Sequence, residues 1–304
     1  MMPTPTTQRG YALTHAKMAQ PFVHAPLFRS LEKGQQKQLK LDITYTVKDA
    51  KVGTMSTFRF WGPEPLGATD LRVLQGLVAV ATGQSLVQGN TPERLGDDGS
   101  MRANLKLRGD ALAHSVIAAR FRLTAFAQTL GYVRPGRGTL SQLRDSIERL
   151  SAVTVVVRKP GFDGSYHILS GYERDTASDE VVVGLNPSLT AAVLGENEFL
   201  RVDFNEVRTL RSDAARLIHS RLHWINQGSR RPVSIETLCQ YVYADESTAS
   251  ASTVRQRRRT VRLALKELAE LGWGIEYTRP ESVFVQRPAA KHSRIARHKI
   301  TVKH

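Results

Sequence analysis

Residues Ser252–Tyr277, with the sequence STVRQRRRTVRLALKELAELGWGIEY, combine a helical pattern of apolar residues with a dense cluster of arginines. At about 100° of rotation per residue, Val254, Val261, Leu265 and Leu268 fall on one stripe, which is typical of a helix face packed on a core. The segments WGIEY, TRPES and VFVQR then predict a strand, a turn and a second strand. The sequence therefore predicts a long helix followed by a two-stranded ribbon.

The basic side chains of this helix share a second stripe beside the apolar one. The stripe consists of Arg255, Arg258, Arg259, Arg262 and Lys266. A solvated face is the ordinary explanation, but like charges four residues apart cost a few tenths of a kcal/mol each. Cations in the first turns also oppose the helix dipole, while Glu267 and Glu270 stand at the end that favours cations. Phosphates near the first turns would remove both costs, so we expect this stripe to bind nucleic acid.

Arginine is well suited to reading bases, because its planar fork makes two hydrogen bonds to guanine O6 and N7. We expect Arg255, Arg258 and Arg259 to approach base edges. We expect Arg262 and Lys266 to lean towards phosphate. The expected surface also includes Thr253 at the helix start and Arg279 in the turn of the ribbon, although Arg279 could equally be an ordinary turn residue.

The composition supports a polyanionic partner. The chain has 304 residues, of which 41% are hydrophobic, and this length suits about two domains. Its 43 Lys and Arg exceed 28 Asp and Glu, giving a net charge of +15, which favours nucleic acid or an anionic membrane surface. No apolar run approaches the roughly 18 residues of a membrane span, and the N-terminus lacks the apolar centre of a signal peptide. Because the single cysteine, Cys239, also suits a reducing compartment, we expect a cytoplasmic protein with no membrane partner.

The segments before the arginine helix follow a recognisable order. Ser212 and Asp213 cap the helix AARLIHSRLHWI, and the short strand RRPVSI and the helix IETLCQYV come next. In the first half, Thr69 and Asp70 precede the helix LRVLQGLVAVA. A strand in HSVIAARF, a helix TAFAQTLG, a helix capped by Thr139 and the strands VTVVVRK and SYHIL follow. Beyond them, Pro187 suits the first position of a further helix, SLTAAVLG. Both halves thus predict a helix, a short strand, two helices and a ribbon, which is the winged helix-turn-helix order.

These patterns predict an α+β fold with two tandem winged helix-turn-helix domains in one chain. We expect a flexible N-terminal arm over residues 1–26, which are polar and rich in Pro and Thr. The first winged-helix domain, which includes a hairpin over residues 40–61, covers 27–203, and the second covers 204–288. Residues 289–304 form a basic C-terminal tail.

The first half offers weaker candidates for DNA contact. Three polar residues lie near the start of the second helix of its helix-turn-helix, namely Ser141, Gln142 and Arg144, and Arg137 lies just before that helix. Arg158 and Lys159 lie at the foot of its ribbon. Such residues contact DNA but are equally usual on any protein surface. Both interpretations stay open for this half.

The sequence lacks the motifs of common DNA-dependent enzymes. It has no G-x-x-x-x-G-K-[ST] loop for ATP, and no His-hydrophobe-His pair of the kind that rolling-circle initiators combine with a nucleophilic tyrosine. His219 and His223 lie four residues apart, but no Glu completes an H-E-x-x-H motif, so a helix-packing or surface pair is favoured over a metal site. We expect a protein that is not an enzyme, with no catalytic residue, cofactor or metal.

The chain resembles the IncQ-type plasmid replication initiators known as RepC. The resemblance runs from about Pro26 to Pro288 and rests on several long stretches in the right order: GPEPLGATDLRVLQGLVA, DSIERL, VGLNPSLTAAVLG, RVDFNEVRTLRSDAARLIHSRL, SIETLCQYVY and the arginine helix itself. It implies an initiator that binds tandem repeats, called iterons, in double-stranded DNA at a plasmid origin. It also implies opening of adjacent AT-rich DNA, and helicase loading with a plasmid-encoded helicase and primase.

Other functions stay open at this stage. A transcriptional repressor or autoregulator on the same scaffold is the main alternative, and an enzyme acting on DNA is a more distant one. Two recognition helices in one chain would enter successive major grooves, roughly one helical turn apart, which predicts a footprint of about two turns on a direct repeat. A homodimer away from DNA is kept as an alternative to a monomer.

Overall fold

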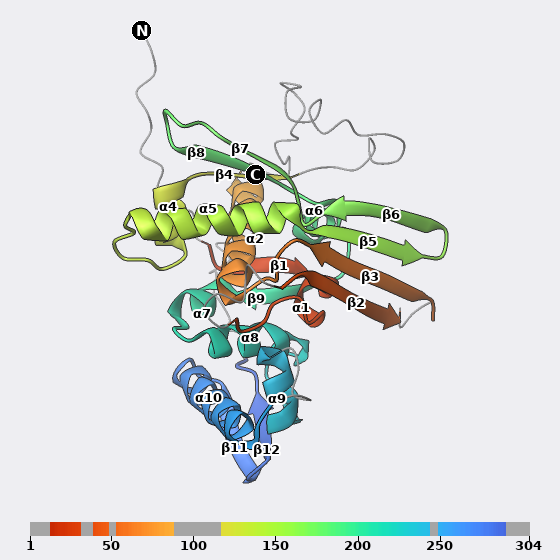
Figure 1. Ribbon diagram of the computed structural model, residues 1–304, viewed down its shortest axis with the longest axis vertical. Helices are drawn as coiled ribbons and strands as arrows, with labels where there is room; N and C mark the ends of the chain where they lie inside the picture. Colours follow the sequence, from red (N-terminus) through yellow and green to blue (C-terminus); the bar gives the residue numbers. More distant parts are fainter. Residues whose placement is uncertain (1–12, 32–38, 49–52, 88–116, 244–248, 290–304) are drawn as a thin grey trace, which may run out of the picture.

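The computed structural model describes residues 13–31, 39–48, 53–87, 117–243 and 249–289 (Figure 1). The described helices are α1 (Gln20–His24), α2 (Ala68–Val87), α4 (Leu123–Thr129), α5 (Arg137–Ala152), α6 (Pro187–Leu194), α7 (Phe204–Thr209), α8 (Asp213–Arg221), the 3-10 helix η3 (Leu222–Trp224), α9 (Ile235–Val242) and α10 (Ala251–Glu270). The described strands are β1 (His15–Ala19), β2 (Leu41–Lys48), β3 (Met55–Gly62), β4 (Ala118–Arg122), β5 (Thr154–Lys159), β6 (Phe162–His167), β7 (Leu169–Arg174), β8 (Glu180–Leu185), β9 (Phe199–Asp203), β10 (Arg230–Ser234), β11 (Gly274–Arg279) and β12 (Ser282–Gln286).

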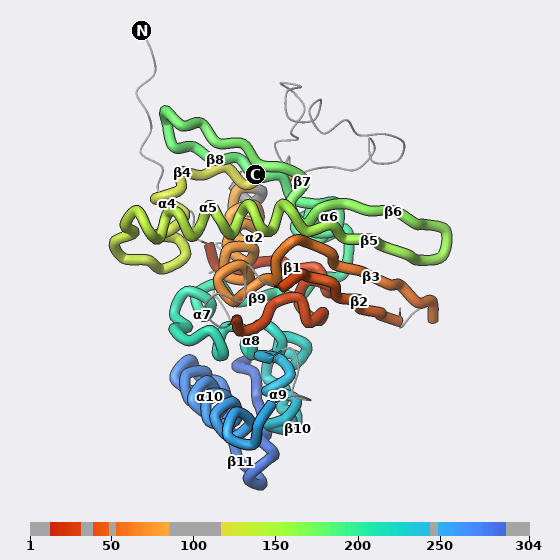
Figure 2. The backbone as a smooth tube through the Cα atoms, viewed as in Figure 1, coloured from red at the N-terminus to blue at the C-terminus, as the bar shows by residue number. Residues whose placement is uncertain are grey.

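These strands form antiparallel sheets. Together with the helices they make the protein a mixed α and β structure. The sheet orders are β1-β9, β2-β3-β5-β6, β4-β8-β7 and β10-β12-β11. The β2–β3 and β5–β6 hairpins lie side by side and extend from one flank of the molecule, while α9, α10 and β10–β12 lie at one end (Figures 1 and 2). The hairpin expected over residues 40–61 is confirmed as β2 and β3.

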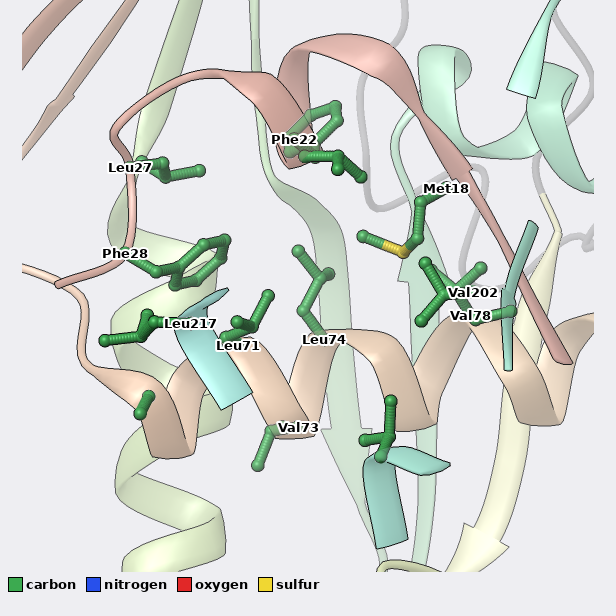
Figure 3. Close-up of a cluster of buried hydrophobic side chains, with 14 of the residues drawn as sticks. Met18, Phe22, Leu27, Phe28, Leu71, Val73, Leu74, Val78, Val202 and Leu217 are labelled. Atoms are coloured by element: carbon green, nitrogen blue, oxygen red, sulfur yellow. The ribbon is translucent and has the colours of Figure 1, made fainter. Parts of the chain in front are cut away.

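Helix α2 passes through the centre of the larger part of the molecule. Its side chains are buried almost all round, and Leu71, Leu74 and Val78 meet Met18 and Phe22 in the cluster of Figure 3. A helix that is apolar on every face belongs inside a core. Its one buried acid near the start, Asp70, accepts hydrogen bonds from the Gly67 amide at 2.8 Å and from Arg149 of α5 at 2.8 Å, so α5 is fixed to the central helix.

The flexible arm expected over residues 1–26 is wrong for the part that is described, residues 13–26. Strand β1 pairs with β9, with His15 opposite Asp203 and Ala19 opposite Phe199. Met18 and Phe22 are fully buried against α2 and the neighbouring elements. The physical reason is a short period-two alternation in β1, followed by Pro21 in the first turn of α1, which lets a mostly polar segment bury its few apolar side chains.

Local signals place several helix ends correctly. Ser212 accepts a hydrogen bond from the Ala215 amide and caps α8, and Pro187 occupies the first turn of α6. The cap expected at Thr139 is wrong, because α5 already begins at Arg137 after Gly136.

The two halves differ in how the strand before their last two helices is paired. In the second half, β10 pairs with β12 of the ribbon. In the first half, β4 pairs with β8, and the ribbon β5–β6 instead joins the β2–β3 hairpin. The similarity of the halves therefore extends to the order of elements but not to their sheet pairing.

Direct hydrogen bonds join the C-terminal part to the rest of the molecule. The indole of Trp273 donates to Glu206 at 3.0 Å, Arg287 donates to the Arg201 carbonyl at 2.8 Å, and the Ser30 amide donates to the Val242 carbonyl at 2.7 Å. Arg287 is buried, and its guanidinium also donates to the His223 and Ile225 carbonyls. The contacts to Arg201 and Ser30 fix the position of this C-terminal part relative to the first half.

No helix in the described part of the chain is both long enough and apolar enough to cross a membrane.

Candidate nucleic-acid interface

Helix α10 has a buried apolar face. Ser250 caps it by accepting a hydrogen bond from the Thr253 amide. Three of the four residues expected on the core stripe, Val261, Leu265 and Leu268, are buried, while Val254 is only half-buried near the helix start. The apolar stripe inferred from the periodicity is therefore confirmed over the last three turns.

The basic stripe of α10 divides into exposed and half-buried residues. Arg255, Arg259 and Lys266 are exposed, whereas Arg258 and Arg262 are half-buried. Within the described part of the chain, neither Arg259 nor Lys266 takes part in a hydrogen bond or an ion pair. Their charges are therefore available to an external anion.

Arg257 lies apart from the basic stripe, at the far edge of the apolar face of α10. Its guanidinium lies over the ring of Tyr243, 4.6 Å from the ring centroid. A cation over an aromatic face is attracted by the ring quadrupole. Arg257 therefore packs against α9 and the residue after it, on the side away from the basic surface.

The ribbon β11–β12 is attached to α10 through its turn. Arg262 donates to the Pro280 carbonyl at 3.0 Å, and the Glu281 carboxylate lies 3.4 Å from Arg262 and 3.3 Å from Arg258. Arg279, the other expected contact, is exposed beside this turn. The sequence analysis considered Arg279 in the turn TRPES but not Glu281, which lies two residues further on. The signal that could have identified Glu281 was an acidic residue in a turn beside a basic helix.

A groove of about 770 Å³ runs between α10 and the ribbon. Its lining combines cations with apolar surface: Arg259, Arg262, Leu263, Lys266, Tyr277, Thr278, Arg279 and Pro280. Leu263 and Tyr277 are large apolar side chains that stay exposed there. Four cations without an acid in the lining make this groove suited to a negatively charged chain.

Glu267 and Glu270, at the C-terminal end of α10, both have partners in the folded protein. Glu267 was expected to be badly placed near the C-terminal end of α10, but its carboxylate accepts hydrogen bonds from Ser212 Oγ at 2.7 Å and from the Arg211 and Ser212 amides. It therefore lies against the N-terminus of α8, where the helix dipole favours an anion. Glu270 pairs with Arg211 at 2.9 Å. The contacts with Arg211 and Ser212 thus explain the acids at the end of α10, so these acids are no evidence that α10 binds phosphate.

The candidate DNA contacts of the first half lie on helix α5 and on the β5–β6 ribbon. On α5, Arg137, Ser141 and Gln142 are exposed, while Arg144 is half-buried and donates to the Leu140 carbonyl at 3.3 Å. Asp145 and Glu148 are also exposed on this helix, so its surface is less basic than that of α10.

The ribbon candidates of the first half already have neighbours within the protein. Arg158 lies 3.7 Å from Asp163 on the paired strand, and Lys159 lies over the ring of Phe162 at 5.3 Å. Both side chains are exposed, and a surface ion pair of this kind is weak enough for a phosphate to compete with it.

The two histidines of α8 and η3 form a packing pair. Both are buried; their rings meet edge to face at 4.6 Å, and His219 Nε2 lies 2.7 Å from Glu206. Burial, reinforced by the charges of His219 and Arg287, holds the pKa of His223 well below its usual value. Among the described residues, no group of three His, Cys, Asp or Glu side chains could hold a metal ion.

A basic helix next to a two-stranded ribbon, on a mixed α and β frame, is typical of proteins that bind nucleic acid. Comparison with protein families specifies the class further. The model of the family "Replication protein C (RepC)" matches residues 10–289, and the chain belongs to this family. Membership supports a role in the initiation of plasmid DNA replication and implies DNA binding.

Comparison with solved structures supports the fold. The chain is similar to the crystal structure of domains 2 and 3 of RctB in its selenomethionine form, with a TM-score of 0.50 and 11% identity over 85% of this chain and 94% of that one. A second crystal structure of RctB domains 2–3 has a TM-score of 0.48 and 10% identity, over 83% and 94% of the two chains. A comparison with curated proteins gave no match.

Proposed function

We propose that the protein is a non-enzymatic, sequence-specific double-stranded DNA-binding initiator of plasmid replication. It binds tandem repeats at the origin, promotes opening of adjacent AT-rich DNA and supports loading of a plasmid-encoded helicase with its primase. The observation that carries the proposal is the exposed basic stripe of α10, with Arg255, Arg259 and Lys266 beside a cationic groove.

The elements around α10 support a winged helix-turn-helix over residues 204–288. Helices α9 and α10 form the turn pair, β10 pairs with the ribbon, and α8 packs behind both helices. In this arrangement α10 enters the major groove, and the β11–β12 wing reaches the DNA backbone. The groove between them then receives one sugar–phosphate strand, with its cations at the phosphates and Leu263 and Tyr277 against the sugars.

A second winged helix-turn-helix in residues 27–203 has α4 and α5 as its turn pair and β5–β6 as its wing. Residues 13–26 belong to this unit, because β1 and α1 are packed into its core. Arg137, Ser141 and Gln142 are exposed on α5, which favours them as contacts over the half-buried Arg144. Arg158 and Lys159 lie on the wing, where they contact backbone.

Two DNA-binding units held in fixed positions within one chain favour binding to a direct repeat over binding to a palindrome. The hydrogen bonds from Arg287 to the Arg201 carbonyl and from the Ser30 amide to the Val242 carbonyl hold the second unit against the first. One molecule then covers about two turns of one repeat, with its helices in successive major grooves. Bending or untwisting of the bound DNA then promotes opening of the adjacent AT-rich segment, since the cost of deformation is lowest in easily deformed sequence.

The test is a footprint on the cognate origin, combined with permanganate probing of unpaired thymines. We expect protection of about two helical turns per repeat and reactive thymines in the neighbouring AT-rich segment. Protection of a palindromic promoter site without reactive thymines would instead identify a transcriptional repressor. Cleaved or covalently attached DNA would contradict a non-enzymatic role.

A further inference from the structure

We propose that Glu281 is a positioning residue that sets the sequence specificity of the α10 surface. It holds the fork of Arg258 in place for base recognition and lowers the affinity for DNA of unrelated sequence. This inference rests on the proposed function, because it assumes that α10 reads DNA.

The turn that carries Glu281 is itself fixed from two sides. Pro280 and Glu281 form the two-residue connection between β11 and β12. The Glu281 carbonyl accepts a hydrogen bond from the Ile235 amide at the start of α9, at 3.0 Å, and the Pro280 carbonyl accepts one from Arg262 of α10, also at 3.0 Å. Both helices of the turn pair therefore determine where the Glu281 carboxylate lies.

That carboxylate is shared by two arginines of the basic stripe. Its Oε1 atom lies 3.3 Å from Nη1 of Arg258 and 3.4 Å from Nη2 of Arg262. An arginine has five N–H donors in a rigid plane, so Arg258 can contact Glu281 through Nη1 and keep its Nε and Nη2 edge for a base. Guanine O6 and N7 require such a fixed, two-pronged donor.

The same carboxylate has the opposite effect when no base matches. On unrelated DNA, Arg258 gains most by turning towards a phosphate, as Arg262 does on any DNA, and this leaves the Glu281 charge unpaired beside the DNA backbone. An unpaired anion there repels phosphate. Glu281 therefore lowers affinity for unrelated DNA, whereas in the specific complex Arg258 continues to neutralise it.

The ribbon offers a matched control in Glu276. It is also an exposed glutamate on the ribbon and is also paired with an arginine, Arg230, at 2.6 Å. Side chains alternate along β11, so Glu276 and Tyr277 point to opposite faces, and Tyr277 lines the groove. Glu276→Gln therefore removes the same charge from the face of the ribbon away from α10.

The experiment compares the full chain with Glu281→Gln and Glu276→Gln, measuring Kd for an origin repeat and for a random duplex over a salt series. For Glu281→Gln we expect tighter binding to random DNA, unchanged or weaker binding to the repeat, and a specificity ratio lower by about tenfold. Glu276→Gln should change both Kd values by less than about twofold and keep the ratio. In an Arg258→Ala background, Glu281→Gln should have a much smaller effect on the ratio, because its partner is gone.

The outcomes separate this inference from the proposed function. A wild-type protein that does not prefer the origin repeat would contradict both. A wild type that prefers the repeat, together with an unchanged ratio in Glu281→Gln, would overturn only the role of Glu281. Loss of binding to both DNAs in Glu281→Gln, with a normal thermal midpoint, would also overturn it, since the acid would then support binding in general.

Discussion

Glu267 and Ser212 face each other across the contact between α10 and α8, with Glu267 Oε2 accepting a hydrogen bond from Ser212 Oγ at 2.7 Å. Ser212 in turn caps α8 by accepting from the Ala215 amide. An acid that looks misplaced on its own helix is thus an N-terminal cap of another. The charge pattern of α10 therefore has two separate causes. The start of the helix carries a basic surface, and the end of the helix packs against the start of α8.

Glu267→Ala should destabilise the fold without changing DNA specificity. It removes the acceptor for two amides and a hydroxyl at the start of α8, and the loss of a helix cap costs about 1 kcal/mol. Urea denaturation gives the free energy of unfolding. The control is Glu270→Ala, one turn further on, whose pair with Arg211 is exposed and should contribute less than about 1 kcal/mol. Equal losses in both variants would argue against the cap.

The stripe of α10 should divide into base-reading and phosphate-binding residues. Arg258→Ala and Arg259→Ala are expected to weaken binding to the specific site by tenfold or more, and binding to random DNA by much less, because base contacts carry the discrimination. Arg262→Ala and Lys266→Ala should weaken both about equally and reduce the salt slope by about 1. Kd values for both DNAs over a salt series decide the matter. Equal losses at all four positions would refute the division, though not DNA binding.

The stability of the fold should fall in mild acid because of His223. Burial, together with the charges of His219 and Arg287, holds its pKa well below the ordinary histidine value of about 6.5. The unfolded chain therefore binds a proton that the folded state excludes, so stability is full above about pH 6.5 and falls as the pH drops below that value. Urea denaturation at about pH 7.5 and about pH 5.5 measures the change. In His223→Leu the difference between the two pH values should shrink; an unchanged difference would assign the effect to other groups.

The N-terminal strand should be essential for folding. Met18 is fully buried beside α2, and Met18→Ala should cost about 2–5 kcal/mol. Met55→Ala, in the exposed end of β3, removes the same side chain from a site that is 53% exposed and should cost less than about 1 kcal/mol. Thermal denaturation compares the two variants. A small loss at Met18 would mean that β1 and α1 contribute little to the core.

The sequence was most informative where the structure depends on near neighbours. The core stripe of α10, the cap at Ser212 and Pro187 at the start of α6 follow from residues within one or two helical turns. The hairpin over residues 40–61 follows from alternation and a turn signal. The family resemblance, carried by stretches along nearly the whole chain, was confirmed by the family match over residues 10–289.

Contacts between distant segments could not be predicted in this way. The pairing of β1 with β9, the pairing of β4 with β8, and the cap that Glu267 provides for α8 each join residues more than fifty positions apart. Many partners would satisfy the same strand edge or carboxylate, and the choice depends on how the core packs as a whole. The position of Glu281 between Arg258 and Arg262 also depends on this packing, because the β11–β12 ribbon must fold back onto α10 before the three charges meet. Local periodicity thus predicted a basic helix and the ribbon that follows it, and tertiary packing selected which arginines of the helix stand free and which are held.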